Sequence, residues 1–113
     1  MKNTFVIKKN FEFKNLFSKG KFYKGKYINF YIKSNNKNYN KFGVCTSKKQ
    51  GKAVYRNHIK RLIRENYKNI EERLKIGYSF LININKDKNI REITYHNVEE
   101  DFKNILSNGG YLK

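Results

Sequence analysis

The chain contains no proline or tryptophan, one alanine and one cysteine among its 113 residues. A single cysteine, Cys45, excludes an intrachain disulfide and a cysteine-based zinc site, and we expect it to be a small buried apolar residue. No apolar run approaches the roughly 18 residues of a membrane span. The N-terminal segment MKNTFVIKKNFEF lacks the continuous apolar core of a secretory signal. These absences predict a cytoplasmic protein that does not associate with membranes.

Acidic residues are also scarce, since 9 Asp and Glu stand against 26 Lys and Arg, for a formal net charge of +17. Such a charge favours a polyanion as partner. Part of the lysine excess reflects codon bias, because Lys, Asn, Ile, Phe and Tyr, which AT-rich codons encode, are all abundant. Codon bias does not explain the position of the arginines, because three of the five lie within nine residues, namely Arg56, Arg61 and Arg64. Guanidinium groups make bidentate contacts to phosphate, so this cluster indicates phosphate binding.

Periodicity along the chain predicts one domain over residues 1–113, a two-layer α/β (α+β) fold with the element order α-β-β-β-α-β-α. The first helix is expected over 11–18, with Asn10 as N-cap and Gly20 closing it. Thr94 is expected to cap the last helix, which Asn108 and the following glycines end. The middle helix is expected over about 54–73, and the strands within 21–33 (broken at Gly25), 42–47 and 78–85.

The middle helix has two opposite faces at about 100° per residue. The polar and basic side is formed by Arg56, Asn57, Lys60, Arg61, Arg64 and Lys68, and the apolar side by Tyr55, Ile59, Leu62, Ile63 and Ile70. Solvated helices usually carry ion pairs of both signs, whereas Glu65 is the only carboxylate between Thr46 and Ile70. We interpret the basic side as a surface that binds a polyanion; a merely solvated basic face is the alternative.

The segment before this helix, SKKQGK, combines lysines with a glycine after a strand. It is not a phosphate-binding P-loop, because that motif needs a second glycine five residues before Gly51 and a Ser or Thr after the lysine. Those positions hold Thr46 and Ala53. The sequence therefore excludes a P-loop nucleotide triphosphatase.

The segment Ser47 to Glu65, SKKQGKAVYRNHIKRLIRE, resembles the signature of the protein subunit of bacterial ribonuclease P, S-K-K-x-G-x-A-V-x-R-N-x-x-K-R-x-x-R. The matching residues are Ser47, Lys48, Lys49, Gly51, Ala53, Val54, Arg56, Asn57, Lys60, Arg61 and Arg64. Lys52 and His58 stand where the family often has Asn and Arg. Length, charge and the pattern of Phe13, Phe17 and Lys19-Gly20 extend the resemblance over the whole chain.

The resemblance implies a four-stranded mixed sheet with a left-handed βαβ crossover, as in the second domain of ribosomal protein S5. General handedness rules predict the opposite hand. It also implies that an RNA carries the catalysis and removes the 5′ leader of precursor tRNA. The Mg²⁺ ions would be held mainly by the RNA and the scissile phosphate, and the protein would assist as a subunit without a catalytic residue or metal site of its own.

The resemblance further assigns binding roles to individual residues. Those expected to hold ribonuclease P RNA are Lys48, Lys49, Lys52, Arg56, Asn57, Lys60, Arg61, Arg64 and Lys68. Phe13, Phe17 and Tyr31 are expected to contact the leader. Core packing is an equal alternative for Phe13 and Phe17, and one can pack while the other stacks on RNA. Strand alternation places Tyr27, Asn29 and Tyr31 on one face, opposite Ile28, Phe30 and Ile32.

The residues show no catalytic arrangement of their own. His58 and His96 are the only histidines, and both are expected at the surface or, for His58, against RNA. Glu99, Glu100 and Asp101 are consecutive and therefore diverge on a helix, so we expect a solvated face there rather than a metal site. Two alternatives stay open: a ribosomal-type clamp on rRNA, which the R-N-x-x-K-R-x-x-R spacing disfavours, and a stand-alone nuclease, which would cleave without added RNA.

Overall fold

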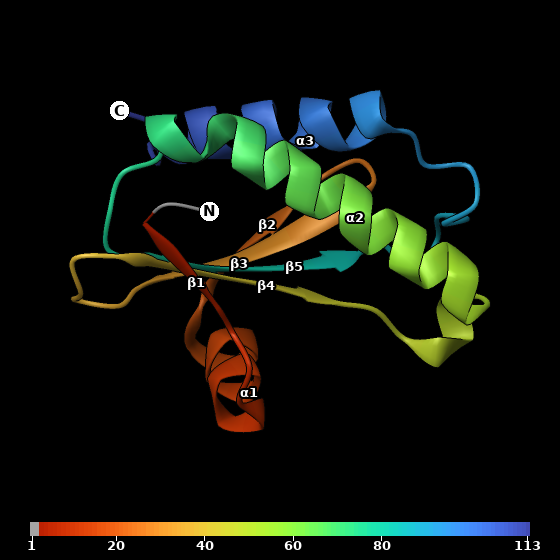
Figure 1. Cartoon of the computed structure of the whole chain (residues 1–113), viewed down its shortest axis with the longest axis horizontal. Helices are drawn as coiled ribbons and strands as arrows, with labels where there is room; N and C mark the ends of the chain where they lie inside the picture. The colour runs from red at the N-terminus through yellow and green to blue at the C-terminus, as the bar shows by residue number, and fades with distance from the viewer. Residues whose placement is uncertain (1–2) are drawn as a thin grey trace.

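The computed structural model describes residues 3–113, which form a sheet covered by helices on both faces (Figure 1). Helices α2 and α3 lie on one face and α1 lies on the other. The elements are β1 (Thr4–Val6), α1 (Asn10–Lys19), β2 (Lys21–Lys24), β3 (Ile28–Ser34), β4 (Asn40–Cys45), α2 (Ala53–Ile70), β5 (Tyr78–Ile84) and α3 (Tyr95–Asn108). Two 3₁₀ turns, η1 (Lys48–Gln50) and η2 (Glu71–Arg73), flank α2.

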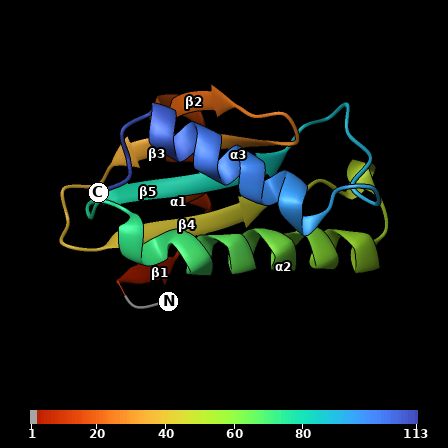
Figure 2. The same cartoon turned by 90° about the horizontal axis from the view of Figure 1, so that it is seen from above.

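The strand order is β1-β4-β5-β3-β2, with β1, β4 and β5 parallel to one another and β3 and β2 antiparallel to their neighbours. This mixed sheet confirms the predicted fold class. In Figure 2, with the helices toward the viewer, the chain passes from β4 through α2 to β5 as a left-handed crossover. The sequence predicted four strands, and the fifth is β1, whose three residues are too few to show alternation. Its Thr4 hydroxyl lies 2.8 Å from the Tyr67 hydroxyl of α2.

The main core lies between the sheet and helices α2 and α3. Alternate residues of β3 (Ile28, Phe30 and Ile32) are buried there, as predicted. The apolar side of α2 and that of α3 complete the core, with Ile59, Ile63, Val98 and Phe102 each at most 1% exposed. Burying a large apolar side chain stabilises a fold by about 1.5–3 kcal/mol, so this layer fixes the orientation of α2 and turns its polar side outward.

The opposite face of the sheet is organised in rows of residues that are neighbours in register. The middle row, Gly43, Leu81, Tyr31 and Phe22, lies closest to α1. A Cβ at Gly43 would stand 3.2 Å from side-chain atoms of both Ile7 and Phe13, so glycine lets the chain around α1 approach the sheet closely. Because α1 crosses the strands, it divides this face into two grooves, one on each flank.

The helix ends agree with the prediction at α3 and differ at α1. Thr94 caps α3: its hydroxyl accepts from the backbone N–H of Asn97, whose side chain accepts in turn from the Thr94 N–H. At α1 the N-cap is Lys9 and Asn10 is already helical, so the predicted cap is wrong by one residue. No side chain caps that end, and packing against the sheet stabilises the short helix instead.

The expectation of a solvated face for Glu99 to Asp101 is wrong for Asp101, which is 3% exposed. Its carboxylate accepts hydrogen bonds from the backbone N–H groups of Lys26, Tyr27 and Ile28, at 2.7–3.0 Å. Asp101 therefore holds the turn between β2 and β3. Sequence spacing alone does not reveal this contact, because it depends on α3 lying over a turn some 75 residues earlier in the chain.

Candidate nucleic-acid interface

Helix α2 lies near the β1–β4 edge of the sheet (Figure 2), and none of its basic residues is among those that it buries. Asn57, Arg61, Arg64 and Lys68 are exposed, and Arg56 and Lys60 are half-buried. The predicted stripe of cations is thus presented to solvent. Within this stripe Arg61 pairs with Glu65, whose carboxylate oxygen lies 3.1 Å from the Arg61 Nε. Such an exposed pair contributes at most about 1 kcal/mol, so it does not prevent Arg61 from binding a phosphate.

The loop before α2 holds further lysines in a defined position. Ser47 and Gln50 form a capping box around η1, and the Gln50 side chain donates to the Ile84 carbonyl at 3.2 Å. The Arg56 Nε donates to the Gly51 carbonyl at 3.1 Å and ties the first turn of α2 to this loop. Lys48, Lys49 and Lys52 remain exposed. The loop therefore extends the cationic surface of α2 beyond its N-terminus.

On one flank of α1 lies a groove of about 730 Å³, which we call the aromatic groove. It is lined by Phe17, Cys45, Thr46, Ser47, Lys49, Gln50, Asn83, Ile84, Lys86, Lys88 and Asn89. The Phe17 ring is 40% exposed and packs edge-on against Tyr31, with 4.8 Å between the ring centroids. Phe13 instead packs into the small cluster of Ile7, Leu16 and Leu81 beneath α1. Of the two phenylalanines, Phe17 is placed to stack on a ligand and Phe13 to hold the helix.

Polar side chains lie in the aromatic groove, where Thr46 and Asn83 are lining residues, and next to it, where Asn29 pairs with Asn83. Within residues 3–113, the side-chain oxygens Oδ1 of Asn29, Oγ1 of Thr46 and Oδ1 of Asn83 have no hydrogen-bond partner. Asn29 and Asn83 are opposite one another on β3 and β5, and Thr46 follows β4. Buried polar atoms normally find a partner, so these three oxygens are acceptors that the described part of the protein leaves unpaired beside the groove.

Cys45 is partly exposed and lines the groove, contrary to the expectation that it is buried. Cys45, at the end of β4, packs against the small cluster beneath α1, which covers it only in part. Desolvation raises the pKa of its thiol, and the positive charge of Lys60 on α2 lowers it in part. Lys49 and Gln50 of η1 line the groove, and the hydrogen bond from Arg56 to the Gly51 carbonyl joins this loop to α2. The basic side of α2 and the aromatic groove therefore form one continuous surface.

Sequence reasoning missed three cations between β5 and α3. Lys86 and Lys88 line the aromatic groove, and the Arg91 guanidinium lies over the Tyr55 ring of α2, 4.8 Å from its centroid. The sequence feature that could have indicated them is a pair of lysines, Lys86 and Lys88, directly after a strand. The parallel strands β4 and β5 have their carboxyl ends side by side, so the loops that follow these strands are also neighbours.

The chain matches the family model described as Ribonuclease P over residues 1–109. The chain belongs to the ribonuclease P protein family. It is 39% identical over 105 residues to the ribonuclease P protein component of Clostridium botulinum (92% of this chain, 93% of the relative). It is 36% identical over 105 residues to that of Fusobacterium nucleatum (91% and 95%).

Solved structures of ribonuclease P proteins share the fold. The protein from Staphylococcus aureus superposes with a TM-score of 0.82 at 26% identity, covering 96% of this chain and 97% of the other. The protein from Thermotoga maritima gives 0.81 at 23% identity, covering 91% and 96%. Family membership places the chain in a ribonucleoprotein that processes tRNA, with ribonuclease P RNA as its partner.

Two further properties concern the described part of the chain. Within residues 3–113, no group of three or more His, Cys, Asp or Glu side chains is arranged to hold a metal ion. None of the helices described there combines the length and the apolar character needed to cross a bilayer.

Proposed function

We propose that the chain holds ribonuclease P RNA on the basic side of α2 and the 5′ leader of precursor tRNA in the aromatic groove. In this way it assists endonucleolytic removal of the leader, while the RNA carries the catalysis. The observation that supports these two roles is that the basic side of α2 and the aromatic groove differ in chemistry but adjoin one another. Exposed arginines and lysines follow α2 and η1, and an exposed aromatic ring with unpaired acceptors lies beside them.

The two surfaces suit two kinds of RNA. A folded RNA presents a dense phosphate backbone, which arginine and lysine bind without regard to sequence. A single strand exposes its bases, and each base that stacks on an aromatic side chain contributes about 1–3 kcal/mol. Phe17 with Tyr31 offers such a platform, and Lys49, Lys86 and Lys88 around it can hold the backbone of the strand.

Magnesium enters the proposal as an ion held by the RNA and by the scissile phosphate. The polar side-chain groups that line the aromatic groove are amide, hydroxyl, thiol and ammonium groups, whereas Mg²⁺ sites in proteins are usually built on one or two carboxylates. The RNA partners also make the cytoplasm the proposed location.

The test is 5′ processing of a precursor tRNA at low magnesium with ribonuclease P RNA alone, the chain alone, and both together. We expect efficient cleavage only from the mixture. The arm with the chain alone is informative, because one related structure is titled a Staphylococcus aureus RNase P protein mutant with defective mRNA degradation activity. Cleavage by the chain alone would contradict the assignment of catalysis to the RNA. Binding without any stimulation would instead favour a ribosomal-type clamp.

The two phenylalanines of α1 should respond differently to truncation. We expect Phe17→Ala to weaken binding of substrates with a leader by at least about five-fold, because one stacking surface is lost, and to leave substrates without a leader unaffected. Phe13→Ala should lower the free energy of unfolding by about 2 kcal/mol, less than a fully buried phenylalanine would. Binding titrations on both substrates and denaturant unfolding of both variants measure this. Equal losses on both substrates for Phe17→Ala would instead assign Phe17 to packing.

A further inference from the structure

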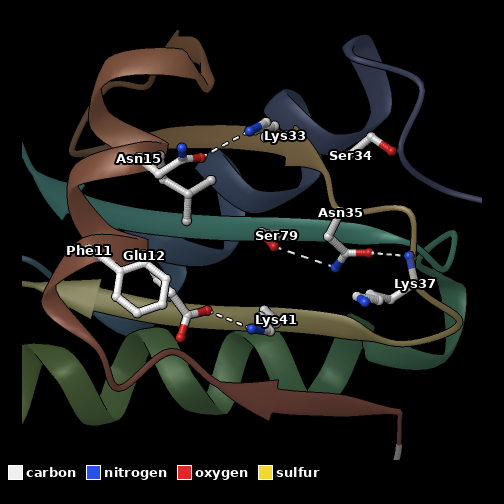
Figure 3. A pocket seen from close by; sticks show the side chains of 10 residues that line it. Phe11, Glu12, Asn15, Lys33, Ser34, Asn35, Lys37, Lys41 and Ser79 are labelled. Carbon is white, nitrogen blue, oxygen red and sulfur yellow. Dashed lines mark hydrogen bonds and ion pairs between the residues drawn. The ribbon is translucent and has the colours of Figure 1, made fainter.

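The other flank of α1 carries a second groove, of about 230 Å³, which we call the lysine groove (Figure 3). Its floor is a row of residues in register on β4, β5 and β3, namely Lys41, Ser79 and Lys33. One wall is the N-terminal half of α1, with Phe11, Glu12 and Asn15. The other wall is the β3–β4 turn with Asn35 and Lys37. The groove lies at the opposite ends of β4 and β5 from the aromatic groove.

The lysines of this groove are held in place by α1. The Lys33 ammonium donates to the Asn15 side chain at 2.9 Å, and the Lys41 ammonium lies 2.6 Å from a Glu12 carboxylate oxygen. The dashed lines of Figure 3 show both contacts. Lys37 is exposed on the turn, which Asn35 orders by donating to the Tyr39 carbonyl. Three ammonium groups thus face one carboxylate among the residues that line the groove within 3–113.

Exposed aromatic rings stand next to these lysines. Phe11 is 66% exposed at the rim. Phe5 is 61% exposed, is opposite Lys41 in the register of β1 and β4, and packs edge-on against Tyr39. Isolated exposed apolar residues are common on proteins, but aromatic rings beside a positively charged groove are the combination that binds single-stranded nucleic acid.

The two grooves are separate sites. Between them α1 packs on the middle row, where Leu16, Leu81 and Ile7 are each at most 4% exposed. Even a Cβ at Gly43 would lie only 3.2 Å from side-chain atoms of Ile7 and Phe13, so no RNA strand can pass under the helix. An RNA segment in the lysine groove is therefore a different segment from the one in the aromatic groove, or reaches it around the outside of α1.

We propose that the lysine groove binds a second segment of single-stranded RNA, with phosphates on Lys33, Lys37 and Lys41 and a base against Phe11. Lys33 and Lys41 lie two strand spacings apart, roughly 10 Å, so they can contact different phosphates of one strand. This inference rests on the proposed function, because it takes RNA as the partner. The segment comes either from the part of the leader farthest from the cleavage site or from an unpaired region of the ribonuclease P RNA.

A short oligouridylate, titrated into the ¹⁵N-labelled full chain, tests for the site directly. We expect the amide resonances of Lys41, Ser79 and Lys33 to shift, in addition to those of Cys45 and Asn83 in the aromatic groove. Shifts confined to the aromatic groove would overturn the second site and leave the proposed function standing. If neither groove responds, leader binding itself is contradicted together with this inference.

Two charge variants with opposite expected signs support this test. Lys33→Gln with Lys37→Gln should reduce the slope of log K against log salt by about 1.4, where K is the oligouridylate binding constant obtained from the lysine-groove resonances. Glu12→Gln should strengthen binding there, because it removes the carboxylate that competes with RNA phosphate for Lys41. The control, Lys103→Gln with Lys113→Gln, removes two exposed charges that do not line either groove. Variants that fail to change affinity in opposite directions would overturn the proposal.

The reconstituted ribonucleoprotein distinguishes the two sources of the segment. Precursor tRNAs with leaders of about 4 and about 16 nucleotides span the range of single-strand sites. If Lys33→Gln with Lys37→Gln weakens binding of the long leader only, the segment is the distal leader. If the variant lowers the affinity for ribonuclease P RNA, the segment belongs to that RNA. The proposal is wrong if both affinities are unchanged.

Discussion

Replacing Arg61 and Arg64 together by glutamine should weaken binding of ribonuclease P RNA by roughly 10²-fold or more at moderate salt. Both side chains are exposed on α2, so the fold loses little, whereas each charge-assisted hydrogen bond to phosphate contributes about 1.5–3 kcal/mol. The slope of log K against log salt should fall by about 1.4–1.8, because two counterions fewer are released. Filter binding or fluorescence anisotropy across a salt series measures both quantities.

The matched control is Arg73→Gln with Lys103→Gln. These residues are also exposed cations, but they line the small hollow between α2 and α3, away from the basic side of α2. An equal loss of affinity in the control would mean that total charge, and not this helix face, holds the RNA. An unchanged salt slope in the Arg61 and Arg64 variant would remove those two residues from the interface.

Asp101→Ala should destabilise the fold by about 3 kcal/mol or more, a large effect for a polar residue on α3. It removes an acceptor shared by the buried N–H group of Ile28 and the partly buried N–H groups of Lys26 and Tyr27. A buried donor left without a partner costs about 1–3 kcal/mol. For a domain of this size we expect the melting temperature to fall by roughly 10–15 °C. Asp101→Asn keeps one oxygen acceptor and should give an intermediate value.

Glu100→Ala is the control for Asp101→Ala, since it removes a negative charge from the preceding residue, whose side chain is exposed. Thermal and denaturant unfolding of the three variants should rank Asp101→Ala, Asp101→Asn and Glu100→Ala in order of decreasing loss. A similar loss for Glu100→Ala would show that the charge of α3, and not the hydrogen bonds to the turn, is responsible.

Most of the secondary structure was predictable because it depends on local periodicity. The alternation of β3 and the two sides of α2 each repeat over several turns or residue pairs, so chance does not easily reproduce them. The cap at Thr94 is equally local, because donor and acceptor lie three residues apart. Strand β1 was missed, since three residues hold too little pattern and pairing with β4 alone stabilises it as a strand.

The positive charges that α2 brings to the candidate site could be predicted from the sequence. Which residues form the aromatic groove beside it could not. The cation stripe of α2 follows from helical geometry, and family resemblance supplied the hand of the crossover. Which of Phe13 and Phe17 packs could not be known, because it depends on how α1 is rotated over Gly43. Lys86, Lys88 and the unpaired oxygens join the site only because the ends of β4 and β5 are neighbours.

Residue order alone specifies every helix and strand except β1, and it also specifies the basic side of α2 and the class of partner, since these follow from spacing within about twenty residues and from net charge. Strand register and the placement of α1 are tertiary properties. They are fixed because only one pairing of the strands buries the apolar residues in the core. A shift of one residue in register would exchange the two faces of a strand. That strand pairing brings Asp101 against the turn between β2 and β3 and leaves a groove on each flank of α1.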